Sequence, residues 1–206
     1  FCFVFRNPRP PKSTLFPYTT LFRSLPSQNE PDGPELAVLT RTPQGNTNIR
    51  RARVITKNID RDLALIRIEG PPLSALKIGD SSMVQEGQAI AFTGFPIGGA
   101  LGFSPVTHRG IVAAITPIAI PGGNAKQINE KLINQIKRGS FEIFQLDATA
   151  YPGNSGSPLF DAETGFVVGV INMVFVKGSK ESALAAPSGI SYAIPSIFVN
   201  QLLNEN

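Results

Sequence analysis

The chain has 206 residues, an apolar fraction of 42%, a formal net charge of +4 and a single cysteine. A barrel protein of this length commonly forms one compact domain, and its apolar content suffices for a buried core. No apolar run reaches the length needed to cross a bilayer as a helix, and one cysteine excludes an intramolecular disulfide or a thiolate metal site.

The first 24 residues look foreign to the rest of the chain. Thr14–Ser24 is similar to the translation of a common sequencing-library adapter, and Arg9–Ser13 fits its upstream extension with one substitution at Lys12. The chain also begins at Phe1 rather than at a methionine. We expect residues 1–24 to be a non-native segment that replaces the true beginning of the gene, and such segments are left out of fold reasoning. The alternative is a natural basic, proline-rich leader.

The positive charge is concentrated in that first segment. It holds four of the 19 basic residues and none of the 15 acidic ones, so the remaining chain has 15 of each sign. A net charge near zero, with no basic stripe interleaved with aromatic residues, argues against a nucleic-acid partner. Cys2 lies in the same segment, and the remainder contains no cysteine.

From residue 35 onward, short apolar runs are separated by glycine, proline and asparagine, a pattern that predicts strands. The predicted strands are Glu35–Arg41, Arg51–Thr56, Leu63–Ile68, Gln88–Thr93, Val106–Ile115, Glu142–Leu146, Phe166–Met173 and Ile190–Ile194. Many short strands of this kind favour an all-β barrel or sandwich.

Two segments have the spacing of amphipathic helices. Ala125–Arg138 places four apolar side chains on one face, and Asn124 and Gly139 can cap its two ends. A second helix is predicted directly after Pro195. Its packing face would consist of Ile197, Phe198, Leu202 and Leu203.

A serine lies among glycines at Gly153-Asn154-Ser155-Gly156, just before an apolar run that begins at Leu159. Glycine lets the backbone turn sharply and approach a substrate closely, so nearby N–H groups can point at one spot. Two such groups stabilise the oxyanion that forms when a serine attacks a carbonyl. A polar turn between strands is the alternative, and the motif by itself leaves both interpretations open.

Five blocks of sequence, taken in order, decide between these interpretations. Asp62–Ile68, Ala91–Gly98, Val106–Val112, Gly153–Leu159 and Ser188–Pro195 each resemble a segment of the trypsin-like serine proteases. The fit is best to the disulfide-free bacterial branch, the HtrA/Do-like and glutamyl-endopeptidase-like enzymes. The resemblance implies an all-β, two-barrel trypsin-like fold with an incomplete N-terminal barrel, a C-terminal helix and one inserted helix.

The resemblance also implies the domain limits. Residues 25–80 would be the remnant of the N-terminal barrel with its linker, and residues 81–206 would form the C-terminal barrel with the terminal helix. The helix at 125–138 is not part of the family's core. It would be either a surface decoration packed on the barrel or a lid near the substrate cleft.

Catalysis in this family requires a nucleophile, a base and a group that orients the base. The resemblance assigns Ser155 as the nucleophile, Asp62 as the orienting carboxylate and Gly153 as an oxyanion donor. A surface carboxylate ahead of a strand is the commoner fate of an aspartate. The apolar residues that follow Asp62 predict a buried strand, which favours the functional interpretation.

The base has no candidate in this sequence. In the family, the histidine lies a few tens of residues upstream of the aspartate, whereas the chain's only histidine, His108, lies downstream of Asp62. We expect His108 to be an ordinary partly exposed histidine. The chain would then be a fragment of a serine endopeptidase that has lost its triad histidine and is nearly inactive. The alternative is a catalytically inactive, protease-like peptide-binding module.

The same resemblance implies substrate-binding residues at Thr149, Ala150, Ile171 and Ser191. Thr149, six residues before the nucleophile, would form the base of the specificity pocket, and it supplies no charge there. We therefore expect a small or medium apolar P1 residue in a peptide or protein substrate. Periplasmic or secreted location is implied as well, with no cofactor and no metal.

Two other motifs, the nucleophile elbow of a serine hydrolase and the phosphate-binding loop of a nucleotide-binding protein, fit this sequence less well. The nucleophile elbow of an α/β-hydrolase has glycine two residues after its serine, where this chain has Ser157, and Pro158 leads into a strand rather than a helix. The glycine-rich segment Gly98–Gly102 lacks the Lys-Ser/Thr pair of a phosphate-binding loop.

Overall fold

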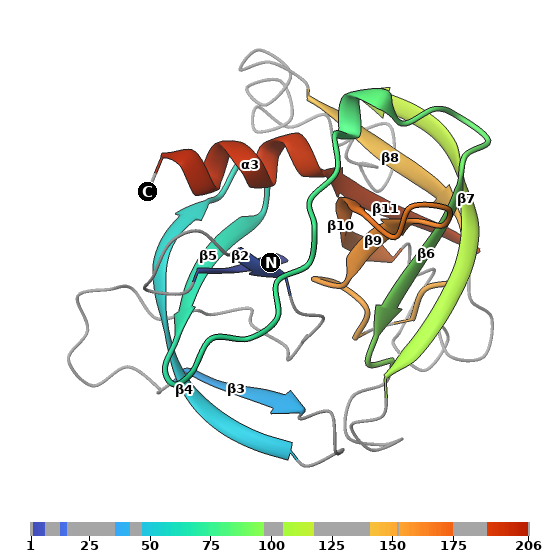
Figure 1. The fold of residues 1–206 in the computed structure, drawn as a ribbon. Helices are drawn as coiled ribbons and strands as arrows, with labels where there is room; N and C mark the ends of the chain where they lie inside the picture. The colour runs from blue at the N-terminus through green and yellow to red at the C-terminus, as the bar shows by residue number, and fades with distance from the viewer. Residues whose placement is uncertain are drawn as a thin grey trace, which may run out of the picture.

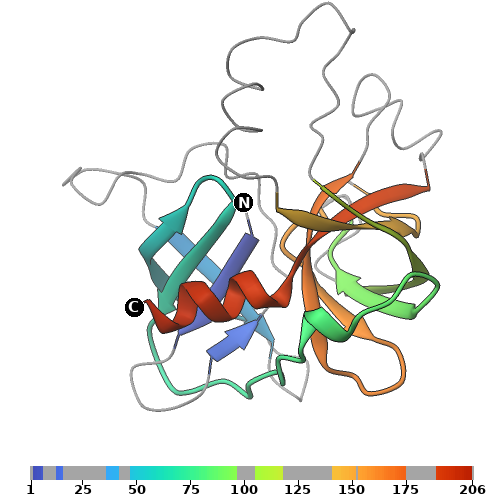
Figure 2. The same ribbon diagram turned by 90° about the horizontal axis from the view of Figure 1, so that it is seen from above.

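The computed structural model describes residues 2–6, 13–15, 36–41, 47–96, 105–117, 141–151, 153–174 and 189–205. These residues form an open N-terminal sheet and a closed C-terminal barrel, with one helix packed across both (Figures 1 and 2). The predicted all-β architecture, with an incomplete first barrel and a C-terminal helix, is confirmed. The predicted helix at 125–138 lies outside the described residues.

The N-terminal sheet has five strands in the order β2-β1-β5-β4-β3. Its strands are β1 (Cys2–Arg6), β2 (Ser13–Leu15), β3 (Leu36–Arg41), β4 (Thr47–Asn58) and β5 (Leu63–Ile68). Strand β4 pairs antiparallel with both β3 and β5, and β1 lies parallel to β5.

Strands β1 and β2 lie within the segment predicted to be adapter-derived, for which no strand is predicted. An unpaired strand edge exposes a row of N–H and C=O groups that any extended segment can satisfy. The edge of β5 would be such an edge, and Cys2–Arg6 covers it. This pairing is compatible with a foreign origin of the segment, which stays a prediction.

Strand β5 is buried on both faces. Leu63 and Leu65 pack toward the barrel and the C-terminal helix, while Ala64, Ile66 and Ile68 pack into a separate core with β3 and β4. A strand covered on both sides needs an almost continuous apolar sequence. Its observed bounds equal the predicted ones. The turn that precedes β5 is thereby fixed close to the junction between sheet and barrel.

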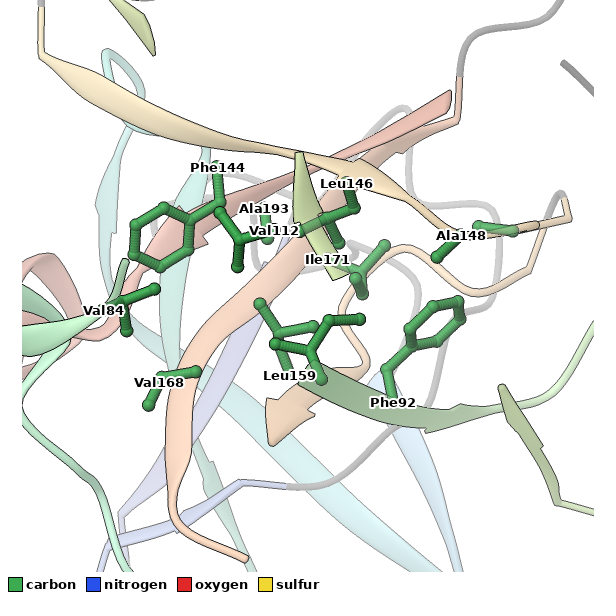
Figure 3. Packing of buried hydrophobic residues seen from close by; sticks show 12 residues of the cluster. Val84, Phe92, Val112, Phe144, Leu146, Ala148, Leu159, Val168, Ile171 and Ala193 are labelled. Atoms are coloured by element: carbon green, nitrogen blue, oxygen red, sulfur yellow. The ribbon is translucent and has the colours of Figure 1, made fainter. Parts of the chain in front are cut away.

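The barrel closes in the strand order β10-β11-β8-β7-β6-β9, which leaves no open edge. Its strands are β6 (Ala89–Gly94), β7 (Val106–Pro117), β8 (Glu142–Asp147), β9 (Pro158–Asp161), β10 (Val167–Val174) and β11 (Ile190–Pro195). The short strand β9 was predicted only as part of an apolar run. The barrel interior is filled by side chains from these strands, among them Phe92, Val112, Phe144, Leu146, Leu159 and Ile171 (Figure 3).

A linker with one short 3-10 helix, η1 (Ser81–Met83), connects sheet and barrel, and helix α3 (Ser196–Asn204) ends the described chain. The buried face of α3, Val199 and Leu202, packs with Leu63 and Leu65 of β5. Ser196 Oγ donates a hydrogen bond of 2.8 Å to the Gly79 carbonyl of the linker. The helix thus joins the two halves of the molecule (Figure 2). None of the helices in the described ranges has the length and apolarity needed to cross a membrane.

Candidate active site

The loop around Ser155 lies between β8 and β9 and is docked onto strand β10. The Gly156 amide donates to the Ile171 carbonyl at 2.6 Å, and the Ile171 amide donates to the Ser157 carbonyl at 2.8 Å. Gly153 and Gly156 have φ angles of 108° and 89°, a region that favours glycine over residues with a Cβ. The loop therefore owes its shape to the two glycines of the motif and its position to the backbone of β10.

The amide groups of the loop fall into two sets. The Asn154 amide donates to the Tyr151 carbonyl, and the Ser157 amide donates to the Asn154 carbonyl, both at 3.0 Å. The Gly153 and Ser155 amides have no acceptor among the described residues. These two N–H groups are available to stabilise an anion next to the Ser155 hydroxyl.

Behind the loop, the side chains of Asn154 and Ser157 are 0% and 1% exposed. Both press against Gly94 at the end of β6, where an added Cβ would overlap Asn154 Oδ1 and Ser157 Oγ. Within the described ranges, those two oxygen atoms have no hydrogen-bond partner. Because the packing admits no side chain at position 94, glycine is the residue that fits there.

Asp62 ends the turn that leads into β5. Its φ of 51° lies in the left-handed region, which aspartate tolerates better than most residues. Asn172 Nδ2 donates a hydrogen bond of 3.0 Å to Asp62 Oδ2. The turn is braced as well by the Arg61 amide, which donates to Asn58 Oδ1 at 3.0 Å.

Arg61 anchors the same turn to helix α3. One of its guanidinium nitrogens donates to Gln201 Oε1 at 2.6 Å. The guanidinium carbon lies 4.2 Å from the centroid of the Phe198 ring, a distance typical of a cation–π contact. The Phe198 ring in turn meets Phe141 edge to face at 5.1 Å.

Strand β10 brings the predicted nucleophile and carboxylate to one place. Its residue Ile171 holds the nucleophile loop through the backbone, and the next residue, Asn172, holds Asp62 through its side chain. Asn172 lies at an irregularity in the pairing of β10 with β11, between Ile171 and Met173. Bulges of this kind commonly re-aim a side chain beside a functional site.

The four predicted substrate-binding residues have different environments. Thr149 is half-buried, and Ala150 packs with the barrel core. Ile171 is fully buried in the same core, and its backbone pairs with the nucleophile loop. Ser191 is also fully buried, and its hydroxyl donates to the Ala148 carbonyl at 3.2 Å. Their contact with a substrate stays a prediction.

His108 lies in β7 and is partly buried, as its sequence context predicted. Its ring stacks on Phe92 with a centroid distance of 4.9 Å and lies 6.0 Å from the Tyr151 ring. Burial lowers the pKa of His108 below that of a free histidine. Its hydrogen-bond partner among the described residues is Asn154, not Ser155 or Asp62.

Sequence reasoning missed two residues of this site. Asn172 is not among the predicted site residues, and His108 is predicted to be an ordinary, partly exposed histidine. Period-2 alternation would have placed His108 on the same side of β7 as Val112, which is 0% exposed. No comparable signal points to Asn172, because a bulge interrupts the alternation next to it.

The family assignment rests on a comparison with known proteins. A family model described as trypsin-like peptidase domain matches residues 25–170. A probable periplasmic serine endoprotease DegP-like of Marinomonas sp. (strain MWYL1) is 31% identical over 145 residues, which is 70% of this chain and 25% of the relative. A serine protease Do-like HtrA of Lactobacillus helveticus is 29% identical over 155 residues, or 75% of this chain and 33% of the relative.

Solved structures agree in fold. The HtrA-type protease AlgW with decapeptide superposes with a TM-score of 0.58 at 24% identity, covering 82% of this chain and 43% of that chain. The chain spans only about a quarter to a third of the length of the curated relatives it matches. Because the family model matches residues 25–170, most of its length, the chain belongs to the trypsin-like peptidase family. It is similar to the HtrA/DegP-like members of that family.

Proposed function

We propose that this chain is part of the peptidase domain of a serine endopeptidase, with Ser155 as nucleophile and Asp62 as the carboxylate that orients the base. The observation that carries the proposal is the division of the loop amides. Gly153 and Ser155 keep their N–H groups free of other described residues, while the amides of Asn154, Gly156 and Ser157 are bound within the protein.

The chemistry follows from this arrangement. The Ser155 hydroxyl attacks the scissile carbonyl as its proton passes to a base, and the negative oxygen of the tetrahedral intermediate accepts hydrogen bonds from the Gly153 and Ser155 amides. The carbon–nitrogen bond then breaks, and the amine leaves with the proton that the base returns. Water hydrolyses the resulting acyl-enzyme by the same steps in reverse order.

The base of this family is a histidine that precedes the aspartate, and the 206 residues contain no histidine before Asp62. The proposal therefore includes near-inactivity of the polypeptide of these 206 residues. Loss of one triad member leaves the oxyanion donors and binding alone, with a drop on the order of 10⁴-fold or more. The base would be restored in a protein that carries a histidine in the corresponding strand of the first barrel.

The substrate would be a peptide or protein with a small or medium apolar P1 residue, since Thr149 brings no charge to the expected pocket. Support for a peptide comes from neighbours in fold, which were solved with a decapeptide and a tripeptide. A periplasmic or secreted location is proposed because the matched relatives are named periplasmic serine endoproteases.

The test uses the protein encoded by the complete source gene, with Ser155→Ala and Asp62→Asn as variants. We expect the intact protein to cleave a peptide library after apolar P1 residues. Ser155→Ala should lower kcat about 10⁶-fold and Asp62→Asn about 10⁴-fold. The polypeptide of residues 1–206 is the matched control, and it should show only residual cleavage. Equal activity of that polypeptide and the intact protein would contradict the role of an upstream histidine.

A peptide-binding module without catalysis is the second candidate, and the position of the single histidine in the second barrel favours it. This function predicts that the intact protein binds peptides with the same affinity before and after Ser155→Ala and cleaves none of them. Isothermal titration alongside the cleavage assay separates the two functions.

A further inference from the structure

The only histidine of the chain lies directly behind the predicted nucleophile. On β7, His108 shares the inward face with Val112, which is completely buried in the barrel core. Its cross-strand partner on β6 is Phe92, and the two rings stack at 4.9 Å with an interplanar angle of 22°. A polar ring in such a position needs a hydrogen-bond partner to offset its loss of water.

That partner is the residue before Ser155. Asn154 Nδ2 lies 3.4 Å from His108 Nε2, and Asn154 is 0% exposed. With the amide turned as the structure has it, its NH₂ group donates to Nε2, which places the proton of the neutral ring on Nδ1. Burial lowers the pKa of His108, and this favours the neutral form of the ring.

Asn154 is the central residue of the loop. Its amide donates to Tyr151 and its carbonyl accepts from Ser157, so its backbone lies between the two amides that are free to bind an anion. Its side chain is the third attachment, wedged between Gly94 and His108. A shift of this side chain would tilt the peptide groups on both sides of it.

We propose that His108 is a positioning residue, which holds Asn154 by a hydrogen bond and thereby fixes the Gly153 and Ser155 amides that face the substrate. Only the assignment of these two amides as oxyanion donors rests on the proposed function. The hydrogen bond and its effect on the loop exist with or without catalysis.

Protonation of His108 would replace the acceptor at Nε2 with a donor facing the Asn154 NH₂ group, so the Asn154 side chain would have to lose this hydrogen bond or turn over to present Oδ1. The ring meets Phe92 from β6, Tyr151 from the segment before the loop, and Asn154. Tyr151 is the one titratable group among them. Within the described ranges, no carboxylate, ammonium or guanidinium group is bonded to the ring.

The experiment is an NMR titration of the 206-residue chain, in which a single histidine gives a single set of imidazole signals. We expect the His108 ring to titrate below the ordinary value of about 6.5. The amide signals of Asn154, Ser155 and Gly156 should move with the same midpoint. Titration of the ring without any movement of these amide signals would overturn the proposal, and this measurement needs no substitution.

Three variants separate the hydrogen bond from packing. His108→Phe keeps a ring on Phe92 but removes the acceptor, and it should shift the amide signals of the loop. His108→Gln restores an acceptor oxygen, and it should return them toward the wild-type positions. Arg109→Gln, on the exposed side of β7, is the matched control and should leave them unchanged. Equal loop signals in His108→Phe and wild type would also overturn the proposal.

Kinetics of the intact protein give an independent readout. A loop displaced by a fraction of an ångström should lower kcat roughly 10- to 100-fold with KM nearly unchanged, since misplacement of about 1 Å costs about 10²-fold. This loss is expected for His108→Phe and not for His108→Gln. Absence of cleavage in every protein, together with the expected NMR result, would refute the proposed function and leave the role of His108 standing.

Discussion

Gly94→Ala tests the packing that supports the nucleophile loop. The added methyl group would overlap two atoms, Asn154 Oδ1 and Ser157 Oγ, both on buried side chains. Neither side chain can swing into solvent, because Asn154 is also held at both its amide and its carbonyl. The strand end and the loop must therefore move apart.

The size of the effect follows from this overlap. Extra methyl groups in a packed interior cost about 1–3 kcal/mol, and an overlap with two fixed atoms belongs at about 3 kcal/mol. For a domain of this length, about 3 kcal/mol corresponds to a fall in Tm of roughly 6–12 °C. Gly165→Ala makes the same chemical change in open space, where only its φ of 70° opposes a side chain. We expect about 1 kcal/mol there, or roughly 2–4 °C.

Thermal unfolding followed by circular dichroism measures both variants, and hydrogen exchange of the loop amides locates the effect. In Gly94→Ala, the amides of Asn154 and Ser157 should exchange faster than in wild type, whereas in Gly165→Ala they should not change. The close packing of Gly94 against the loop would be contradicted if Gly94→Ala has a Tm no lower than that of Gly165→Ala and its loop amides keep their protection from hydrogen exchange.

Three further predictions concern the carboxylates and the helix. Asn172→Leu removes the amide that donates to Asp62. The free energy of unfolding in urea should fall by about 1.5–3 kcal/mol, the range for a hydrogen bond to a charged group, and an unchanged urea midpoint would refute this. Arg61→Ala should cost about 1 kcal/mol and speed amide exchange in the last turn of α3, with Arg61→Lys intermediate; equal exchange in all three proteins would argue against the anchor. Hydrogen bonds from the Thr164 side chain and backbone lower the pKa of Asp161, so the unfolded chain binds this proton at higher pH than the folded chain does. Stability from Asp161 is present above the unfolded pKa and lost as pH falls through the folded value; below about pH 4, Asp161→Asn should flatten the decline in Tm, and parallel curves would contradict this.

Much of the fold could be predicted because its strands are set by local pattern. Strand β5 has the predicted bounds since a strand buried on both faces is apolar throughout, and α3 begins directly after Pro195 as expected. Strands β1 and β2 escaped prediction for a different reason. Their pairing depends on an open edge of β5, which is a property of the assembled sheet and not of their own sequence.

The site was predicted less completely, because its members meet through contacts between distant segments. The two glycines near Ser155, Gly153 and Gly156, are required by positive φ angles. Such a local requirement can be recognised in the sequence. The partner of Asp62 is Asn172, 110 residues away, and no spacing rule joins the two. The left-handed backbone of Asp62 is equally hidden, since aspartate occurs in many other conformations.

The irregularity in β10 explains how one strand can hold both halves of the site. In a regular strand, successive side chains point to opposite faces. Ile171 is buried in the barrel core, whereas the Asn172 side chain reaches the turn before β5, where it donates to Asp62. Between Ile171 and Met173 the pairing with β11 advances by only one residue, from Ala193 to Tyr192, which makes Asn172 the extra residue of a bulge. Its side chain is thereby released from the strict geometry of the ladder, and it can reach Asp62 while the Ile171 backbone, one residue earlier, stays paired with the nucleophile loop.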